Sequence, residues 1–271
     1  MLIRAGYDIR FETEQAVPML AALRVHPSRR QDLRSADPVM ADPSVAMHDY
    51  LDGFGNACTR FTIPAGGITL STRFEIEDNG EPDLRAADGP QWAVERLPDS
   101  ALIYLMGSRY CETDRLMEVA WKTFGHLASA RDRVEAVVDF VNSHITFGYE
   151  HARPDKTAWN GWQERCGVCR DYAHLAITLC RCLNIPARYC TGYLGDIGIP
   201  PVDAPMDFSA WFDVFIAGNW YTYDARHNQP RIGRILMARG RDATDTALTT
   251  AFGKAVLKEF TVYTEEIIPV S

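Results

Sequence analysis

Cys166-Gly-Val-Cys-Arg-Asp-Tyr-Ala-His-Leu175 is the stretch of sequence from which the fold can be inferred. After Cys169, apolar residues recur at the three- and four-residue spacing of a buried helix face. They are Tyr172, Leu175, Ala176, Leu179 and Leu183. Asn184-Ile-Pro186 then ends the pattern, because proline cannot continue a helix. The sequence therefore predicts a helix that begins at or just before Cys169.

The position of Cys169 at a helix start favours a chemical role. A cysteine in the first helical turn meets unpaired backbone N–H groups and the positive end of the helix dipole, and both favour the thiolate. Cys180 and Cys182 lie instead within the apolar stripe, where a cysteine serves packing. We interpret Cys169 as a candidate nucleophile, with packing alone as the other interpretation.

Composition and charge exclude several classes of partner. The chain has 271 residues, 46% hydrophobic and 24% charged, which is ordinary for a domain with a full core. Its net charge of -8 gives no electrostatic support for a nucleic-acid or anionic-membrane partner. No apolar run approaches the roughly 20 residues of a membrane span. Seven cysteines at irregular spacing argue against a disulfide framework and favour a cytoplasmic location.

Residues 1–85 are expected to form a β-rich domain. Apolar residues alternate with more polar ones over residues 3–11 and again over residues 68–76, which is typical of strands with one buried face. Pro64-Ala-Gly-Gly67 precedes the second segment as a hairpin-like turn. The acidic, proline- and glycine-bearing stretch Asn79–Pro90 is then expected to link this domain to a second one, residues 86–271.

The second domain is predicted to place helices before strands. Thr113 and Ser129 can each cap an amphipathic helix ahead of the cysteine helix. Short segments rich in β-branched and aromatic residues follow, with Gly218-Asn219 as a tight turn. They are Ala187–Leu194, Trp211–Ala217, Trp220–Asp224 and Val256–Ile268. Helices followed by strands indicate an α+β domain rather than an α/β one.

Several motifs of residues 100–260 occur in the order found in the transglutaminase-like superfamily. They are Gly167-Val-Cys-Arg-Asp-Tyr-Ala-His174, Asn184-Ile-Pro-Ala-Arg188, Thr191-Gly-Tyr193, Ala210-Trp-Phe-Asp213 and Trp220-Tyr-Thr-Tyr-Asp224. The chain therefore resembles the bacterial branch of this superfamily, whose core is often preceded by a β region. The resemblance implies a papain-like α+β core and a thiol acyl-transfer or amide-hydrolysis mechanism.

The resemblance also implies a catalytic set, with one departure. Cys169 corresponds to the nucleophile and Asp224 to the residue that orients the base, but Ser209 stands where the family has its histidine. A serine hydroxyl is not a useful proton acceptor at neutral pH, whereas imidazole titrates near about 6.5. In this reading Asp224 orients Ser209, a water molecule or a histidine from elsewhere.

Three histidines are alternatives for the base. His174 lies about 140° around the helix from Cys169, so it is expected to be a core residue. His227 lies three residues after Asp224, where it can line the substrate site or swing towards the thiol; its ordinary interpretation is a loop residue bonded to backbone. His151 precedes the cysteine helix and can line the mouth of the site.

Two further features lie beside Cys169. Trp162 is expected to line a substrate cleft, with packing as the ordinary interpretation. Cys166-x-x-Cys169 matches half of a zinc site or a redox motif, but neither a second ligand pair nor a parallel βαβ context accompanies it. No metal and no other cofactor is therefore expected.

Three hypotheses of function follow. The first is a thiol enzyme that acts on a peptide, a protein or a small amide substrate, and the surroundings of Cys169 favour it. The second is a non-catalytic descendant that keeps the fold as a binding or interaction module, which Ser209 favours. The third is a different thiol- or carboxylate-based reaction in which Ser209 makes room for a substrate group.

Overall fold

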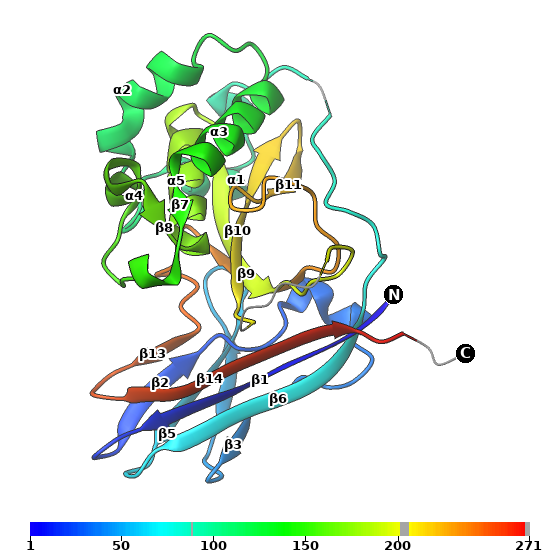
Figure 1. Ribbon diagram of the computed structural model, residues 1–271, viewed down its shortest axis with the longest axis vertical. Coiled ribbons are helices and arrows are strands. Elements are labelled where there is room, and N and C mark those ends of the chain that lie inside the picture. Colours follow the sequence, from blue (N-terminus) through cyan, green and yellow to red (C-terminus); the bar gives the residue numbers. More distant parts are fainter. Residues whose placement is uncertain (88, 201–205, 269–271) are drawn as a thin grey trace.

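The computed structural model describes residues 1–87, 89–200 and 206–268. A β-rich region forms one end of the molecule, and a sheet covered by helices forms the other (Figure 1). The mixed composition confirms the predicted α+β class. Within the described residues, none of the helices has the length and apolar character needed to cross a bilayer.

The β-rich region consists of two four-stranded antiparallel sheets. One has the order β14-β1-β6-β3, with strands Val256–Glu266, Leu2–Glu12, Ile68–Glu77 and Met40–Asp42. The other has the order β13-β2-β5-β4, with strands Thr249–Ala251, Val17–Ala21, Ala57–Ile63 and His48–Leu51. Their inner faces share one apolar core.

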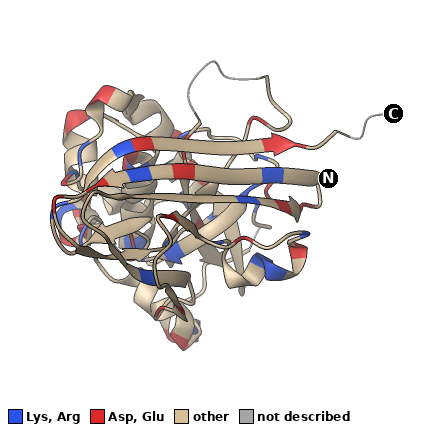
Figure 2. Cartoon of the chain, turned by 90° about the horizontal axis from the view of Figure 1, so that it is seen from below, with Lys and Arg blue, Asp and Glu red and all other residues tan. Residues whose placement is uncertain are grey.

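Burial of alternate residues confirms the period-two pattern. The buried side chains of β1 and β6 are Ile3, Ala5, Tyr7, Ile9, Phe11, Ile68, Leu70, Thr72, Phe74 and Ile76. Basic and acidic residues are interspersed along the strands of this sheet (Figure 2), at positions between the buried ones. Ion pairs cross the strands there, for example Arg4 with Glu75 at 3.1 Å and Arg10 with Glu259 at 3.3 Å.

The turn Pro64-Ala-Gly-Gly67 differs from the predicted hairpin. The strand before it, β5, lies in one sheet, and the strand after it, β6, lies in the other. Gly67 has a φ of +118°, and a Cβ there would lie 2.1 Å from the carbonyl oxygen of Phe11. The glycine therefore allows the chain to pass close to β1 as it changes sheets.

The domain boundary differs from the predicted division into residues 1–85 and 86–271. The C-terminal part of the chain returns to the β-rich region, because β13 pairs with β2 and β14 pairs with β1 from Ile3↔Glu266 to Glu12↔Val256. Without β14, β1 would leave a row of unpaired backbone groups at the sheet edge. The β-rich region is thus built from both ends of the chain.

The helical region surrounds α5, Cys169–Cys182. Helices α2, Thr113–Phe124, α3, Ala130–His144, and α4, Ala158–Glu164, contact α5, as do strands β9 and β10. The sheet has the antiparallel order β11-β10-β9-β12, with strands Asn219–Tyr223, Ser209–Ile216, Ala187–Tyr193 and Ile235–Gly240. A short parallel pair joins β7, Thr146–Phe147, to β8, Cys166–Gly167.

Smaller helical turns complete the chain. They are α1, Asp99–Leu102, and the 3-10 turns η1, Pro27–Asp32, η2, Val94–Arg96, η3, Ile103–Leu105, and η4, Tyr149–His151. The predicted cap of α3 is present, since the side chain of Ser129 accepts a hydrogen bond from Asp132 N–H at 3.0 Å. The turn between β10 and β11 is Ala217-Gly218, one residue earlier than predicted, and both residues have positive φ.

Two buried histidines make the folded state sensitive to acid. Burial lowers the pKa of His26 to about 4 and also lowers the pKa of His174. The Nε2 atom of His174 accepts a hydrogen bond from Ala243 N–H at 3.2 Å, which requires the neutral ring. An unfolded histidine takes up its proton near about pH 6.5, so below that pH the unfolded state binds more protons than the folded state.

We expect the free energy of unfolding to fall as the pH is lowered from 7 to 5. Each histidine contributes a fall of up to about 1.4 kcal/mol per pH unit below its unfolded pKa. Urea denaturation at several pH values measures this slope. The His174→Gln variant should show a smaller slope than the parent protein, and an equal slope would contradict the assignment to His174.

Candidate active site

Cys169, the first residue of α5, lines a cavity of about 370 Å³. The walls also come from the segment after β9, the start of β10 and the turn after β11. Ser209 and His227 line this cavity together with Cys169. The structure thus brings a thiol, a hydroxyl and an imidazole to one place.

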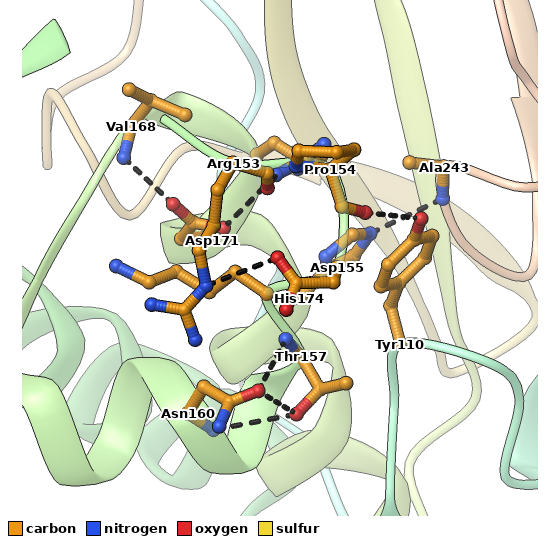
Figure 3. Close-up of polar contacts among 12 residues, drawn as sticks. Tyr110, Arg153, Pro154, Asp155, Thr157, Asn160, Val168, Asp171, His174 and Ala243 are labelled. Atoms are coloured by element: carbon orange, nitrogen blue, oxygen red, sulfur yellow. Dashed lines mark hydrogen bonds and ion pairs between the residues drawn. The ribbon is translucent and has the colours of Figure 1, made fainter. Parts of the chain in front are cut away.

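Asp171 fixes the N-terminus of α5. Its Oδ2 atom accepts a hydrogen bond from the Val168 backbone N–H at 2.9 Å (Figure 3). Gly167 makes room for this contact, because a Cβ there would lie 2.5 Å from the same oxygen. The N–H of Cys169 belongs to the first turn of the helix, where N–H groups have no partner within the helix. Such groups can stabilise an oxyanion.

The segment before α4 braces the same helix end (Figure 3). The guanidinium of Arg170 donates a hydrogen bond to the carbonyl oxygen of Arg153. Arg153 in turn forms a two-pronged ion pair with Glu164, at 2.8 and 2.9 Å. The hydroxyl of Tyr110 donates to the carbonyl oxygen of Pro154 at 2.6 Å. Cys169 is therefore presented by a fixed helix end.

Asp224 holds the turn that carries His227. Its Oδ1 atom accepts hydrogen bonds from the backbone N–H groups of Arg226 and His227, at 3.0 and 3.1 Å. Its Oδ2 atom lies 2.8 Å from Nδ1 of His227. The carboxylate can only accept, so Nδ1 carries the proton and Nε2 of the neutral ring keeps its lone pair. No described residue hydrogen bonds to Nε2.

Arg234 forms a buried ion pair with Asp224. Its Nη2 donates to Asp224 Oδ2 at 3.0 Å, and its Nε donates to the two oxygens of Asp83 at 3.1 and 2.9 Å. Burial alone would raise the pKa of the Asp224 carboxyl, but Arg234 and His227 outweigh it and hold this pKa well below its usual range. Asp83 belongs to the predicted linker, so the linker supports the site.

Ser209 is the first residue of β10 and is buried at the cavity wall. Its Oγ atom has no hydrogen-bond partner among the described residues. Asp224 bonds to His227 and Arg234 instead. Of the three partners that the sequence left open for Asp224, the structure gives the histidine, His227.

The remaining predicted residues lie outside the cavity within the described part of the chain. Trp162 stacks on Trp159 at 5.1 Å, and its carbonyl oxygen lies 2.7 Å from Nε2 of His144, which is the packing interpretation. His174 is fully buried and is the expected core histidine. His151 lies in η4, where its Nε2 atom is 3.5 Å from Oε1 of Glu150.

The thiol of Cys169 differs from the expectation of a favoured thiolate. Burial raises the pKa of Cys169 to about 11, although Arg226 and the Ala210 backbone N–H lower it; Asp207 and Asp224 raise it further. Desolvation of the charged form thus outweighs the favourable effects of Arg226 and the Ala210 N–H. At neutral pH the sulfur carries its proton, so a reaction needs a base nearby.

Sequence reasoning missed the roles of Asp83, Arg226 and Arg234. Asp83 and Arg234 are 151 positions apart and meet only in the folded chain. Arg226 could have been found from the sequence, since it lies between Asp224 and His227. A second, larger cavity of about 630 Å³ on the side of Asp83, Arg234 and Trp211 contains neither Cys169 nor His227. It is therefore not the candidate reaction site.

Comparisons with known proteins find the same kind of fold. Residues 119–225 match the family model of the transglutaminase-like superfamily. The crystal structure of a proposed cysteine protease from Cytophaga hutchinsonii is similar with a TM-score of 0.85 and 26% identity, covering 100% of this chain and 92% of that one.

Mycobacterial sequences are also similar. An uncharacterised protein of Mycobacterium leprae is 23% identical over 215 residues, which are 76% of this chain and 75% of that protein. An uncharacterised protein of Mycobacterium tuberculosis is 29% identical over 232 residues, 77% of this chain and 71% of that protein.

The fold and the cysteine helix define a protein with a cysteine-protease-type α+β core. Residues 119–225 match the core of the transglutaminase-like superfamily. The resemblance inferred from the sequence motifs is thereby confirmed.

We expect Cys169 to react with iodoacetamide faster than Cys180 and Cys182. Only Cys169 lines the cavity, whereas the other two are fully buried and burial raises the pKa of Cys182 to about 12. The rate at Cys169 should keep rising above pH 9, because the thiolate fraction grows about tenfold per pH unit below its pKa. Mass spectrometry of timed samples measures both. Equal labelling of the three cysteines would contradict the prediction.

We expect Arg234→Gln to lower the free energy of unfolding by about 3–5 kcal/mol, because it leaves the Asp224 carboxylate buried without its cation. The Arg4→Gln variant is a matched control, since Arg4 forms its ion pair with Glu75 at 3.1 Å while the two side chains are 50% and 37% exposed. That exposed pair should contribute less than about 1 kcal/mol. Urea denaturation compares the two, and similar losses would contradict a special role for Arg234.

Proposed function

We propose that this protein is a thiol enzyme that hydrolyses or transfers the acyl group of a peptide or another amide. The observation that carries the proposal is the 2.8 Å contact between Asp224 and His227 Nδ1 in the wall of the cavity that contains Cys169. Cys169 is the nucleophile, His227 is the base, and Asp224 holds the imidazole in the tautomer that accepts the thiol proton.

The reaction begins with a neutral thiol. Nε2 of His227 takes the proton of Cys169 as the sulfur attacks the carbonyl carbon of the substrate. The negative charge that develops on the carbonyl oxygen is stabilised by N–H groups at the start of α5. The imidazolium then gives its proton to the leaving nitrogen, and a thioester remains on Cys169. Water breaks it in hydrolysis, and an amine breaks it in transfer.

Ser209 has a different role in this proposal. The superfamily's histidine position is a serine here, and His227 supplies the imidazole from the turn after β11 instead. The Ser209 Oγ atom is buried at the cavity wall and has no partner among the described residues. We assign it as a hydrogen-bonding group for the bound acyl portion of the substrate, because an unsatisfied buried hydroxyl is costly.

Two observations support the type of reaction and the compartment. The similar protein from Cytophaga hutchinsonii is a proposed cysteine protease, which supports hydrolysis of a peptide-like amide. All seven cysteines are free thiols, which supports action in a reducing cytoplasm.

The test separates His227 from Ser209 as the base. The rate at which p-nitrophenyl acetate acylates Cys169 is measured from the p-nitrophenol that this step releases. This rate should fall at least about 10²-fold in His227→Ala, because general-base catalysis is lost. Ser209→Ala should change the rate less than about tenfold, the loss of one hydrogen bond. Cys169→Ala should show no protein-bound acyl group by mass spectrometry.

Two outcomes would overturn parts of the proposal. A folded His227→Ala protein that keeps the parent rate would exclude His227 as the base. The non-catalytic alternative is favoured by the raised pKa of Cys169. It would be supported if the parent protein neither formed an acyl-enzyme with the ester nor released product from amides.

A further inference from the structure

Arg226 places a fixed positive charge in the cavity. Its backbone N–H bonds to Asp224, and its carbonyl oxygen accepts a hydrogen bond from Asn142 at 2.8 Å. Its guanidinium carbon lies 3.9 Å from the centre of the Phe147 ring. The turn and the aromatic ring together hold the side chain against the cavity wall.

Among the described residues, the guanidinium of Arg226 forms no ion pair and its nitrogens form no hydrogen bond. Its positive charge opposes the rise that burial causes in the pKa of Asp207, an acidic residue of the same cavity wall. The other arginine of the cavity, Arg231, is buried and donates to the Gly195 carbonyl oxygen at 2.9 Å. Arg226 therefore differs from its neighbour in having its donors open to a ligand.

The charge of Arg226 acts on the reacting sulfur. Of the charged groups around Cys169, Arg226 lowers the pKa of the thiol most, and Asp207 raises it most. Such interactions fall off with distance, so both charges are close to the thiol. A guanidinium presents donors in a fork that matches a carboxylate.

We propose that Arg226 binds a carboxylate of the substrate. Preferred substrates then carry a free carboxylate close to the acyl group that Cys169 attacks, as in the C-terminal residue of a peptide or a side-chain amide of an amino acid with a free α-carboxyl. The inference about preferred substrates rests on the proposed function. Binding of a carboxylate beside the thiol can be tested without turnover.

A different role for Arg226 predicts a different dependence on charge. If the guanidinium stabilised the developing oxyanion, it would help neutral and anionic compounds equally. If it binds a carboxylate, it helps only compounds that carry one. Two reagents that differ only in this group therefore separate the two roles.

The reagents are iodoacetate and iodoacetamide. In both, the sulfur of Cys169 forms a bond to the methylene carbon, iodide leaves with the electron pair, and the thiol proton goes to His227 or to water. Only iodoacetate carries a carboxylate. The ratio of the two alkylation rates therefore reports carboxylate binding, and any change in the pKa of Cys169 cancels in the ratio.

We expect the ratio of the iodoacetate rate to the iodoacetamide rate at Cys169 to exceed the ratio for glutathione at least tenfold, at pH 7.5 and low salt. Arg226→Gln should bring the ratio down to that of glutathione, whereas Arg226→Lys should keep part of the preference because it keeps the charge. Asp207→Asn should raise the ratio by removing a like charge. Mass spectrometry of the peptide that contains Cys169 measures each rate.

Arg115→Gln serves as the matched control, because Arg115 lies over Trp159 at 4.3 Å and outside the cavity. Its ratio should equal that of the parent. An Arg226→Gln protein with the parent ratio, or with equal losses for both reagents, would overturn the proposal. The result is independent of ester turnover, so failure of the proposed function leaves this test intact.

Discussion

The buried carboxylate of Asp224 joins three parts of the chain. It accepts hydrogen bonds from the turn that carries His227, and it pairs with Arg234, which Asp83 of the linker also holds. A carboxylate so deeply buried is stable in its charged form only while these donors surround it. The site, the segment before β12 and the linker are consequently parts of one polar network. Disturbing any one of them changes the environment of the histidine.

Sequence periodicity was sufficient to predict the cysteine helix and the strands that bury one face. The helix beginning at Cys169 and the alternation in β1 and β6 are local patterns, and the structure shows both. Pairing partners are not local. The sequence of β14 indicates a strand, yet nothing in it says that it pairs with β1 at the other end of the chain. The same limit applies to Asp83 and Arg234, whose contact depends on the whole fold.

The candidate site shows why motif matching identified Cys169 and Asp224 but left the base open. A motif assigns roles by position, and the position of Ser209 carries no imidazole. His227 reaches Asp224 because the turn after β11 brings a residue three positions later back to the carboxylate, with Asn228 N–H bonded to the Asp224 carbonyl oxygen at 2.8 Å. That geometry depends on how Asp224 bonds to its own turn, which becomes visible only in the structure.

In the proposed mechanism the imidazole comes from a turn rather than from a strand, which changes what determines the geometry of the histidine–aspartate pair. A histidine at position 209 would depend on the register between β10 and β11, whereas His227 and Asp224 lie in one short turn. Their contact is therefore set locally, and the first residue of β10, Ser209, places only a small side chain in the cavity wall. The volume that an imidazole would fill there is left to the cavity. We infer that the serine and the displaced histidine are two parts of one arrangement, in which space beside Cys169 is kept for the substrate.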